Sequence, residues 1–298
     1  MIHHSVCPFC KSPDITSAFK CTDHLVSGEV FEIFKCPGCG FLFTQNHPDE
    51  SESVRYYESE EYISHSDSHK TVFDIVYQLA RKVMLIRKKK IVTKNWNRSR
   101  GIILDIGSGT GHFLNSMKKT GWQTEGVEIN IKAREFARSL FNLNLLSPPE
   151  IHSLPDKSFD CITLWHALEH FHEPSDYFNE IKRLLRPDGA LIIAIPNNDS
   201  YDSMYYGSEW AAYDVPRHLW HFSPDIFSLF AEKYGFSVAS RAYLPFDVFY
   251  ISILSEKHKG TRFPFVSGMI RGFIFSLYSS FRRSGSSSIV YVLRHAEI

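Results

Sequence analysis

The chain has 298 residues, of which 43% are hydrophobic and 14% aromatic, so it can bury a sizeable core in one large and one smaller domain, or in two ordinary domains. The 33 basic residues balance 33 acidic ones, which argues against a large nucleic-acid-binding surface because such surfaces need a basic surplus. No stretch reaches the roughly 18 uninterrupted apolar residues of a spanning helix. Residues 1–5 contain no apolar signal region, so we expect a cytoplasmic protein.

Residues 1–45 predict a small metal-binding domain. They carry four of the six cysteines, and in a reducing compartment cysteines bind metal more readily than they form disulfides. These four form two C-P-x-C pairs with 25 residues between them: Cys7, Cys10, Cys36 and Cys39. Two such knuckles place four thiolates around one ion, as in a zinc ribbon, and the closed coordination sphere predicts a structural Zn²⁺. Cys21 or His24 can replace one ligand, although neither lies in a knuckle.

Residues 46–100 form the predicted linker to the next domain. The segment is polar at first and then amphipathic, with apolar residues from Val72 to Ile86 at three- and four-residue steps. A basic run at 87–90 follows. We interpret the helix as a docking helix with a solvated basic end. The alternatives are a lid over a substrate pocket and a helix at anionic lipid headgroups.

From residue 101 onward, strands and helices alternate, which is typical of a doubly wound α/β sheet. We predict a Rossmann-like sheet of seven strands in a domain that spans 101–298 and carries a helical insertion at about 245–288. The predicted strands are 102–106, 123–129, 143–146, 161–165, 190–195, 236–243 and 289–294.

A glycine-rich turn follows the first of these strands. Residues 105–111 read D-I-G-S-G-T-G, so the glycines are spaced G-x-G-x-G, whereas a dinucleotide fingerprint has G-x-G-x-x-G. Glycines at such a turn let a cofactor approach the backbone. Asp105 directly ahead of the turn disfavours a pyrophosphate and suits a ligand with an ammonium or sulfonium centre.

Glu128 ends the second predicted strand, 23 residues after Asp105. A carboxylate at this position of an α/β sheet can accept hydrogen bonds from both hydroxyls of a ribose. The segment 165–174 follows the fourth predicted strand. Because ligands bind outside the carboxyl ends of parallel strands, we expect the turn, Glu128 and this segment to form one site.

Several segments resemble the class I S-adenosylmethionine (AdoMet) methyltransferases, in particular a methyltransferase-23-like subgroup with an N-terminal zinc ribbon. The glycine turn resembles the first motif of the family, and S-F-D-C-I-T-L-W-H-A-L-E-H at 158–170 and R-L-L-R-P-D-G-A-L-I-I-A-I-P-N at 183–197 resemble its fourth- and fifth-strand motifs. D-V-P-R-H-L-W-H-F-S at 214–223 resembles a segment of the subgroup, whereas S-P-P-E at 147–150 departs from the family pattern. The resemblance implies that AdoMet contacts Asp105, Gly107, Ser108, Gly109, Gly111, Glu128, Ile129, Trp165 and His166.

Two histidines are candidate catalytic bases, because the pKa of histidine lies near neutrality. His170 ends the L-E-H segment, where the resemblance to some O-methyltransferases implies a base, and His218 lies in the 214–223 segment. Each can instead be a structural histidine bonded to the backbone. Arg217 can clamp a phosphate or carboxylate of the substrate, or pair with Asp214.

We therefore expect a methyltransferase that moves a methyl group from AdoMet to a small-molecule, sugar- or lipid-linked acceptor by O- or C-methylation. The alternatives are an RNA-modifying methyltransferase that holds RNA with its ribbon, and a non-catalytic AdoMet-binding protein. An NAD-linked oxidoreductase fits the glycine spacing less well. The segment 262–283 is apolar over most of its circumference, so it must lie against the core, a homodimer partner or a membrane surface.

Overall fold

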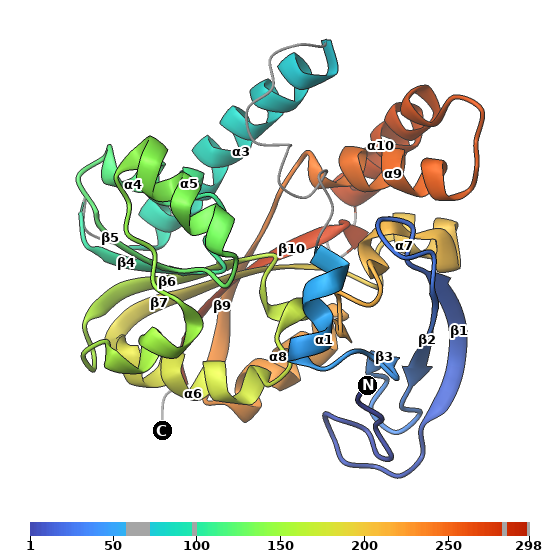
Figure 1. Cartoon of the computed structure of the whole chain (residues 1–298), viewed down its shortest axis with the longest axis horizontal. Coiled ribbons are helices and arrows are strands. Elements are labelled where there is room, and N and C mark those ends of the chain that lie inside the picture. Colours follow the sequence, from blue (N-terminus) through green and yellow to red (C-terminus); the bar gives the residue numbers. More distant parts are fainter. Residues whose placement is uncertain (58–71, 97–99, 282–284, 297–298) are drawn as a thin grey trace.

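The computed structural model describes residues 1–57, 72–96, 100–281 and 285–296. Its larger sheet has the strand order β5–β4–β6–β7–β10–β9 (Figure 1). The first four strands in this order are parallel, and β10 is antiparallel to both of its neighbours. The doubly wound α/β fold is thereby confirmed. The strands are β4 (Ile102–Ile106), β5 (Gln123–Val127), β6 (Phe159–Trp165), β7 (Leu185–Pro196), β9 (Phe236–Tyr243) and β10 (Ser288–His295).

The third predicted strand, 143–146, is reduced to one β-bridge between Leu146 and Val127, so the described part of the sheet has six strands instead of seven. The next residues form the 3-10 helix η2 (Pro148–Ser153), which begins with two prolines. Proline has no N–H with which to extend a ladder, so the pairing stops there. The second predicted strand ends at Val127, which leaves Glu128 in the turn that follows.

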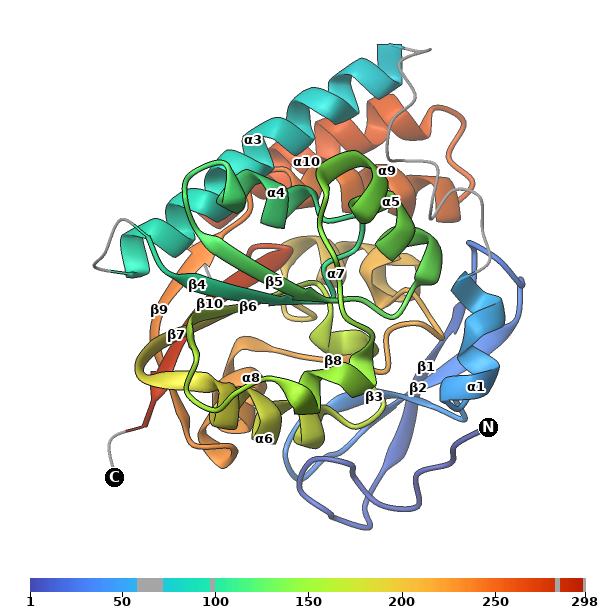
Figure 2. The same cartoon turned by 60° about the vertical axis from the view of Figure 1, so that its left-hand side comes forward.

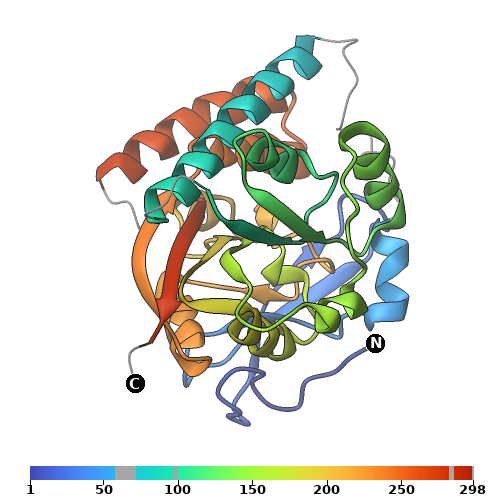
Figure 3. The same cartoon turned by 90° about the vertical axis from the view of Figure 1, so that its left-hand side faces the viewer.

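Helices cover both faces of the large sheet, as the turned views in Figures 2 and 3 show. On β7, Leu191 and Ile193 pack into one core, whereas the alternate residues Ile192 and Ala194 pack into a second core on the other face. One face carries α3 (Val72–Asn95), α4 (His112–Lys118) and α5 (Ile131–Phe141), and the other carries α6 (Pro174–Leu184) and α8 (Pro224–Lys233).

The smaller sheet joins the N-terminal segment to the second half of the chain. Its order is β1–β2–β3–β8, in which β1 (Thr16–Thr22), β2 (Val30–Lys35) and β3 (Leu42–Gln45) come from the predicted ribbon. The fourth strand, β8 (Trp220–His221), belongs to the 214–223 segment and pairs antiparallel with β3. The predicted domains 1–45 and 101–298 therefore share a sheet.

The remaining elements of the described residues are all helical. Residues 282–283 of the predicted apolar segment lie outside the described residues. Among the described residues, no helix combines the length and apolarity that crossing a bilayer requires. The elements are α1 (Glu50–Ser53), η1 (Val54–Tyr57), η3 (Leu168–His170), α7 (Tyr201–Tyr206), η4 (Gly207–Glu209), η5 (Ala211–Tyr213), α9 (Asp247–His258) and α10 (Pro264–Phe281).

A buried histidine at the shared sheet makes the free energy of unfolding of the protein depend on pH. The hydroxyl of Thr44 donates to the carbonyl of His218 (2.7 Å), so its oxygen accepts from Nε2–H of His221 (3.0 Å). Burial lowers the pKa of His221 to about 3. Because the unfolded chain takes up this proton first, the contribution of His221 to stability is complete above about pH 7 and is lost as the pH falls toward 3.

We predict that His221→Gln lowers the free energy of unfolding at pH 7.5 by about 1–2 kcal/mol, since it loses a buried hydrogen bond. The deficit relative to wild type should shrink by about 1 kcal/mol at pH 5.5, because the variant lacks the group that resists protonation. Urea unfolding at the two pH values measures both quantities. His152→Gln, at an exposed position, is the control, and a deficit that stays constant with pH contradicts the assignment.

Candidate active site

The glycine turn after β4 borders open space. Its first two N–H groups, of Gly107 and Ser108, donate to the carbonyl of Val127 (2.9 and 3.1 Å). A Cβ at Gly107 would lie 2.6 Å from Cβ of Ala167, so packing alone requires this glycine. Gly109 has φ +52°, and a Cβ there would meet nothing within 4 Å. The backbone at Gly109 is therefore accessible to a ligand that lies over the turn.

Glu128 is held next to this turn. Its carboxylate accepts from the N–H of Gly109 (2.7 Å, Oε2) and from the N–H of Asn130 (2.8 Å, Oε1). The side chain is fixed by these two bonds, and each oxygen keeps lone pairs for further donors. The structure thus brings Glu128 to the glycine turn, as the strand-end position predicts. Ile129, at the same edge, is 63% exposed.

Asp105 is a buried acid behind the turn. It is 2% exposed, and the hydroxyl of Thr163 donates to its Oδ1 (2.6 Å). Burial raises the pKa of Asp105 to about 7, although the Thr163 hydrogen bond and the ammonium of Lys88 oppose the shift. A buried carboxyl of this kind gains from a cation placed beside it.

Lys88 of α3 is a residue of the site that the sequence analysis missed. Its Nζ lies 4.7 Å from the centre of the Trp165 ring. Burial lowers the pKa of Lys88, and the carboxylates of Asp105 and Asp247 oppose this. The basic run 87–90 is therefore not wholly solvated. Its position on the helix was the feature that could have indicated this, because Lys88 lies three and four residues before Ile91 and Val92 and so shares their helix face. Both of these residues are buried.

Trp165 and His166 lie at the carboxyl end of β6. Trp165 is 8% exposed, and its Nε1 finds no hydrogen-bond acceptor among the described residues. His166 has φ +56°, with Nε2 at 3.1 Å from Asp247 and Nδ1 at 3.4 Å from Glu169. Burial lowers the pKa of His166, but the two carboxylates outweigh it and raise the pKa to about 9. His166 is therefore a cation at neutral pH.

His170 and His218 come together although they are far apart in the sequence. Their ring centres are 4.6 Å apart, and one ligand atom of each lies within 4.8 Å of a carboxylate oxygen of Glu169. Nδ1 of His218 is 2.8 Å from the carbonyl of Ala212, and Nδ1 of His170 is 3.1 Å from that of Arg217. Because a carbonyl only accepts, these contacts favour a hydrogen on each Nδ1, which leaves each Nε2 able to accept a proton. The Tyr57 hydroxyl also lies 3.0 Å from Nδ1 of His170, and Nε2 of His218 lies 3.9 Å from a carboxylate oxygen of Asp214.

Burial governs the charges around this histidine pair. Burial and the neighbouring His218 lower the pKa of His170 to about 4, so it is neutral at pH 7. Glu169 is 1% exposed and accepts no hydrogen bond of good geometry among the described residues. This buried carboxylate, which also pairs with His166 (3.4 Å), stabilises an imidazolium that forms at His170 or His218.

Arg217 is engaged by protein groups. Its guanidinium is 1% exposed and binds both carboxylate oxygens of Asp214, Asp23 of the ribbon (2.9 Å) and the carbonyl of Tyr56 (3.0 Å). The structure therefore contains the salt bridge to Asp214 that was the alternative to a substrate clamp. Four of its five N–H groups are engaged and the group is buried, so it has no exposed pair of donors for a substrate. The substrate-binding prediction for Arg217 is therefore not supported.

The four knuckle cysteines converge on one point. Sγ of Cys7 lies 3.7 Å from that of Cys39, and Sγ of Cys10 lies 3.6 Å from that of Cys36. In a regular tetrahedron with Zn–S bonds of about 2.3 Å, the sulfur atoms are about 3.8 Å apart. The arrangement therefore fits a tetrahedral Zn²⁺.

The two substitute ligands lie elsewhere. Cys21 donates to the carbonyl of Ser208 (3.3 Å), and His24 stacks on His258 with ring centres 4.0 Å apart. Neither belongs to the cysteine cluster.

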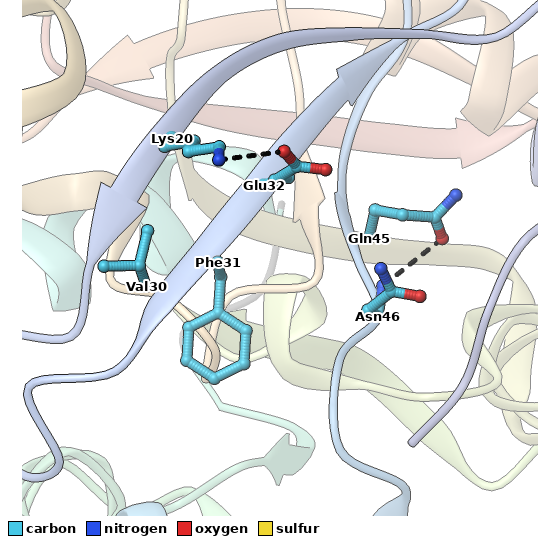
Figure 4. Close-up of a pocket in the computed structure, with 6 residues that line it drawn as sticks. All are labelled: Lys20, Val30, Phe31, Glu32, Gln45 and Asn46. Atoms are coloured by element: carbon cyan, nitrogen blue, oxygen red, sulfur yellow. Dashed lines mark hydrogen bonds and ion pairs between the residues drawn. The ribbon is translucent and has the colours of Figure 1, made fainter.

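A separate hollow of about 280 Å³ lies on the ribbon strands (Figure 4). Its polar groups bind one another: Lys20 pairs with Glu32 (3.5 Å), and the N–H of Asn46 donates to the side chain of Gln45 (3.3 Å). It contains none of the predicted site residues.

Comparisons with known proteins bear on this site. A family model of a methyltransferase domain matches residues 75–241. A ubiquinone biosynthesis O-methyltransferase of Aeromonas salmonicida is 28% identical over 125 residues, which are 39% of this chain and 52% of that protein. A demethylmenaquinone methyltransferase of Tropheryma whipplei is 27% identical over 95 residues, or 30% of this chain and 40% of that protein. The chain thus spans about half the length of the first of these relatives and less of the second.

Among solved structures, a cyclopropane synthase from Mycobacterium tuberculosis has a TM-score of 0.51 at 15% identity, covering 83% of this chain and 99% of that one. This likeness concerns the fold alone. The matched family segment covers more than half of the chain and includes the glycine turn, Glu128 and both candidate bases. The chain belongs to the class I AdoMet-dependent methyltransferases.

Proposed function

We propose that the protein transfers a methyl group from AdoMet to a small-molecule, sugar- or lipid-linked acceptor by O- or C-methylation. The observation that carries the proposal is the common location of the open glycine turn, the fixed Glu128 carboxylate and the histidine pair His170 and His218 at one edge of the sheet. The relatives that are named as quinone methyltransferases support a small-molecule acceptor.

AdoMet supplies the activated methyl group, and the residues present fit it. We propose that the backbone at Ser108 and Gly109 lies against the cofactor, because a Cβ at Gly109 would enter open space. Glu128 keeps lone pairs for the ribose hydroxyls. Asp105 is a buried acid that gains from the cationic amino-acid end, and the unpartnered indole N–H of Trp165 offers a donor.

The two histidines are proposed to remove the proton that an oxygen or carbon acceptor must lose. Methyl transfer needs an acceptor aligned with the methyl group and a base within reach of its proton. The free Nε2 atoms of His170 and His218 serve as that base, and the proton taken up is shared beside the carboxylate of Glu169. We propose that Arg217 has a structural role and does not bind the substrate: it holds the loop that carries His218.

The ribbon is proposed to hold a structural Zn²⁺ and to position His218. The knuckle Cys36–Cys39 directly precedes β3, whose Thr44 donates to the carbonyl of His218 (2.7 Å). The side chain of Asp23 is fully buried and accepts a hydrogen bond of 2.9 Å from Arg217. Arg217 is the residue that precedes His218. The base therefore rests on two contacts from the N-terminal segment.

The function is tested with methyl-labelled AdoMet and a cell extract. We expect label to enter a small-molecule or lipid fraction, and His218→Asn or His170→Asn to lower the rate of transfer by about 10²–10⁴-fold, the usual contribution of a general base. Affinity for S-adenosylhomocysteine (AdoHcy), measured by calorimetry, should stay within about twofold. His258→Asn, at a half-buried histidine outside the site, is the control. Full transfer by both site variants shows that neither histidine is the base, and wild type that labels nothing refutes the enzymatic function.

Cofactor placement is tested at the open glycine. We predict that Gly109→Val lowers AdoHcy affinity by about a hundredfold or more, because the side chain occupies the space over the turn and strains a positive φ. Gly260→Val is a matched control, since Gly260 also has positive φ (+69°) and open space around its Cβ position but lies between α9 and α10. Equal affinities of the two variants would refute the placement.

The role of the ribbon is tested at Asp23. We predict that Asp23→Asn lowers label transfer about tenfold or more, because the loop around Arg217 loses its buried anionic partner. AdoHcy affinity and a zinc content of one per chain should be retained. Asp14→Asn, at an exposed ribbon position, serves as the control. If Asp23→Asn transfers label at the wild-type rate, the ribbon does not position the base.

A further inference from the structure

One face of α10 packs against α9, and its opposite face is apolar and exposed. The packed face is formed by Gly268 and Gly272, where an added Cβ would lie 2.5 Å from Ile253 and 2.7 Å from Phe249. Because α9 and α10 approach each other so closely at these glycines, the opposite face of α10 is the one exposed to solvent. All views place this hairpin on the same side of the large sheet as α3 (Figures 1, 2 and 3).

The outward face forms a ridge of large side chains at three- and four-residue steps. We call it the α10 ridge, and its members are between 40% and 89% exposed. They are Val266, Met269, Ile270, Phe273, Leu277 and Phe281. Burial in the core, one of the three expectations for this segment, is therefore wrong for these residues. A continuous apolar face of this kind marks an interaction site, because monomeric proteins seldom leave one uncovered.

The charges around the ridge indicate what covers it. From Lys257 to Phe281 the chain contains no acidic residue, whereas Lys257 and Arg262 are exposed cations at the end of α9 and before α10. Two further cations, Lys259 and Arg271, lie over the ring of Tyr205 on α7 (5.0 and 4.7 Å). In a twofold contact with a second copy, the same cationic surface meets itself, and like charges oppose such a contact. An anionic lipid surface instead attracts the cations to its headgroups while the apolar side chains enter the acyl boundary.

We propose that the α10 ridge docks this protein on an anionic lipid surface, with its apolar side chains in the acyl boundary and the flanking cations at the headgroups. The ridge is attached to the candidate active site through α9, because Asp247, the first residue of α9, lies 3.1 Å from His166. The docking itself rests on the ridge and its charges, and not on methyl transfer.

Co-sedimentation of the full-length, zinc-loaded protein with vesicles tests the proposal. We expect partition onto phosphatidylcholine vesicles that contain phosphatidylglycerol, weak partition onto phosphatidylcholine alone, and loss of binding as salt is added. The double variant Ile270→Ser, Phe273→Ser should lower the partition coefficient about tenfold or more, since two exposed anchors are removed. Arg262→Gln should weaken binding to the anionic vesicles alone.

Leu229→Ser is the matched control, because Leu229 is 50% exposed on α8, on the other face of the large sheet. It should partition like wild type. AdoHcy affinity shows that each variant is folded, and a variant that binds AdoHcy but not vesicles separates docking from the cofactor site.

Two results overturn the proposal. One is a wild-type protein that stays in the supernatant with anionic vesicles at low salt. The other is a stable dimer in sedimentation velocity that the Ile270→Ser, Phe273→Ser variant splits into monomers while neither protein binds vesicles, which would assign the ridge to a second copy. If vesicles bind and no acceptor is methylated, docking stands and the enzymatic function fails.

Discussion

The buried guanidinium of Arg217 is the constraint on which the arrangement of the site depends. Moving a charge out of water costs several kcal/mol unless partners replace the lost hydration. Here the partners come from three parts of the chain: Asp23 of the ribbon, the carbonyl of Tyr56, and Asp214 of the loop that carries His218. Because removing one partner of a buried ion pair typically costs about 3–5 kcal/mol, we expect the loop to lose this shape when the N-terminal segment is not docked. The shared sheet also holds the loop against the N-terminal segment, because β8 follows the loop and pairs with β3 of the ribbon.

Buried charges of alternating sign also extend across the carboxyl edge of the large sheet. Lys88 interacts with Asp105 and Asp247, and His166 lies between Asp247 and Glu169. Each acid thus shares its cation with a second acid, so none is fully compensated. A cationic ligand beside Asp105 would compensate part of the charge that Lys88 now compensates. The electrostatic interactions of Lys88 with Asp247, and of Asp247 with His166, would change in turn. His170, beyond Glu169, stays neutral because burial outweighs the attraction of that carboxylate and lowers its pKa.

The sequence predicts the parts of this site that are local in the chain. The glycine turn follows the apolar run of β4, and Glu128 follows β5, which alternates with the helices of the sheet. The topology of a parallel sheet then brings the turn and Glu128 to one edge. The cysteine knuckles are local in the same sense. Arg217 is different, since its neighbour Asp23 lies 194 residues away and no spacing rule connects them. Lys88 was hidden in a basic run that usually marks a solvated surface. The prediction of the third strand was wrong because three leucines within four residues satisfy a strand pattern, whereas the prolines after them limit the pairing to one bridge.

Net charge and composition describe the chain as a whole, whereas the kind of molecule that binds a surface depends on the charges at that surface. Equal numbers of acidic and basic residues argue against a nucleic-acid footprint over the whole protein. Yet the acids that balance the sum are in part buried at the site, as Asp105, Glu169 and Asp23 are, each 1–2% exposed. Buried acids act on their immediate neighbours and contribute little to the field outside. The cations beside the α10 ridge have no acid within their own segment, so this surface is more basic toward a partner than the neutral total suggests.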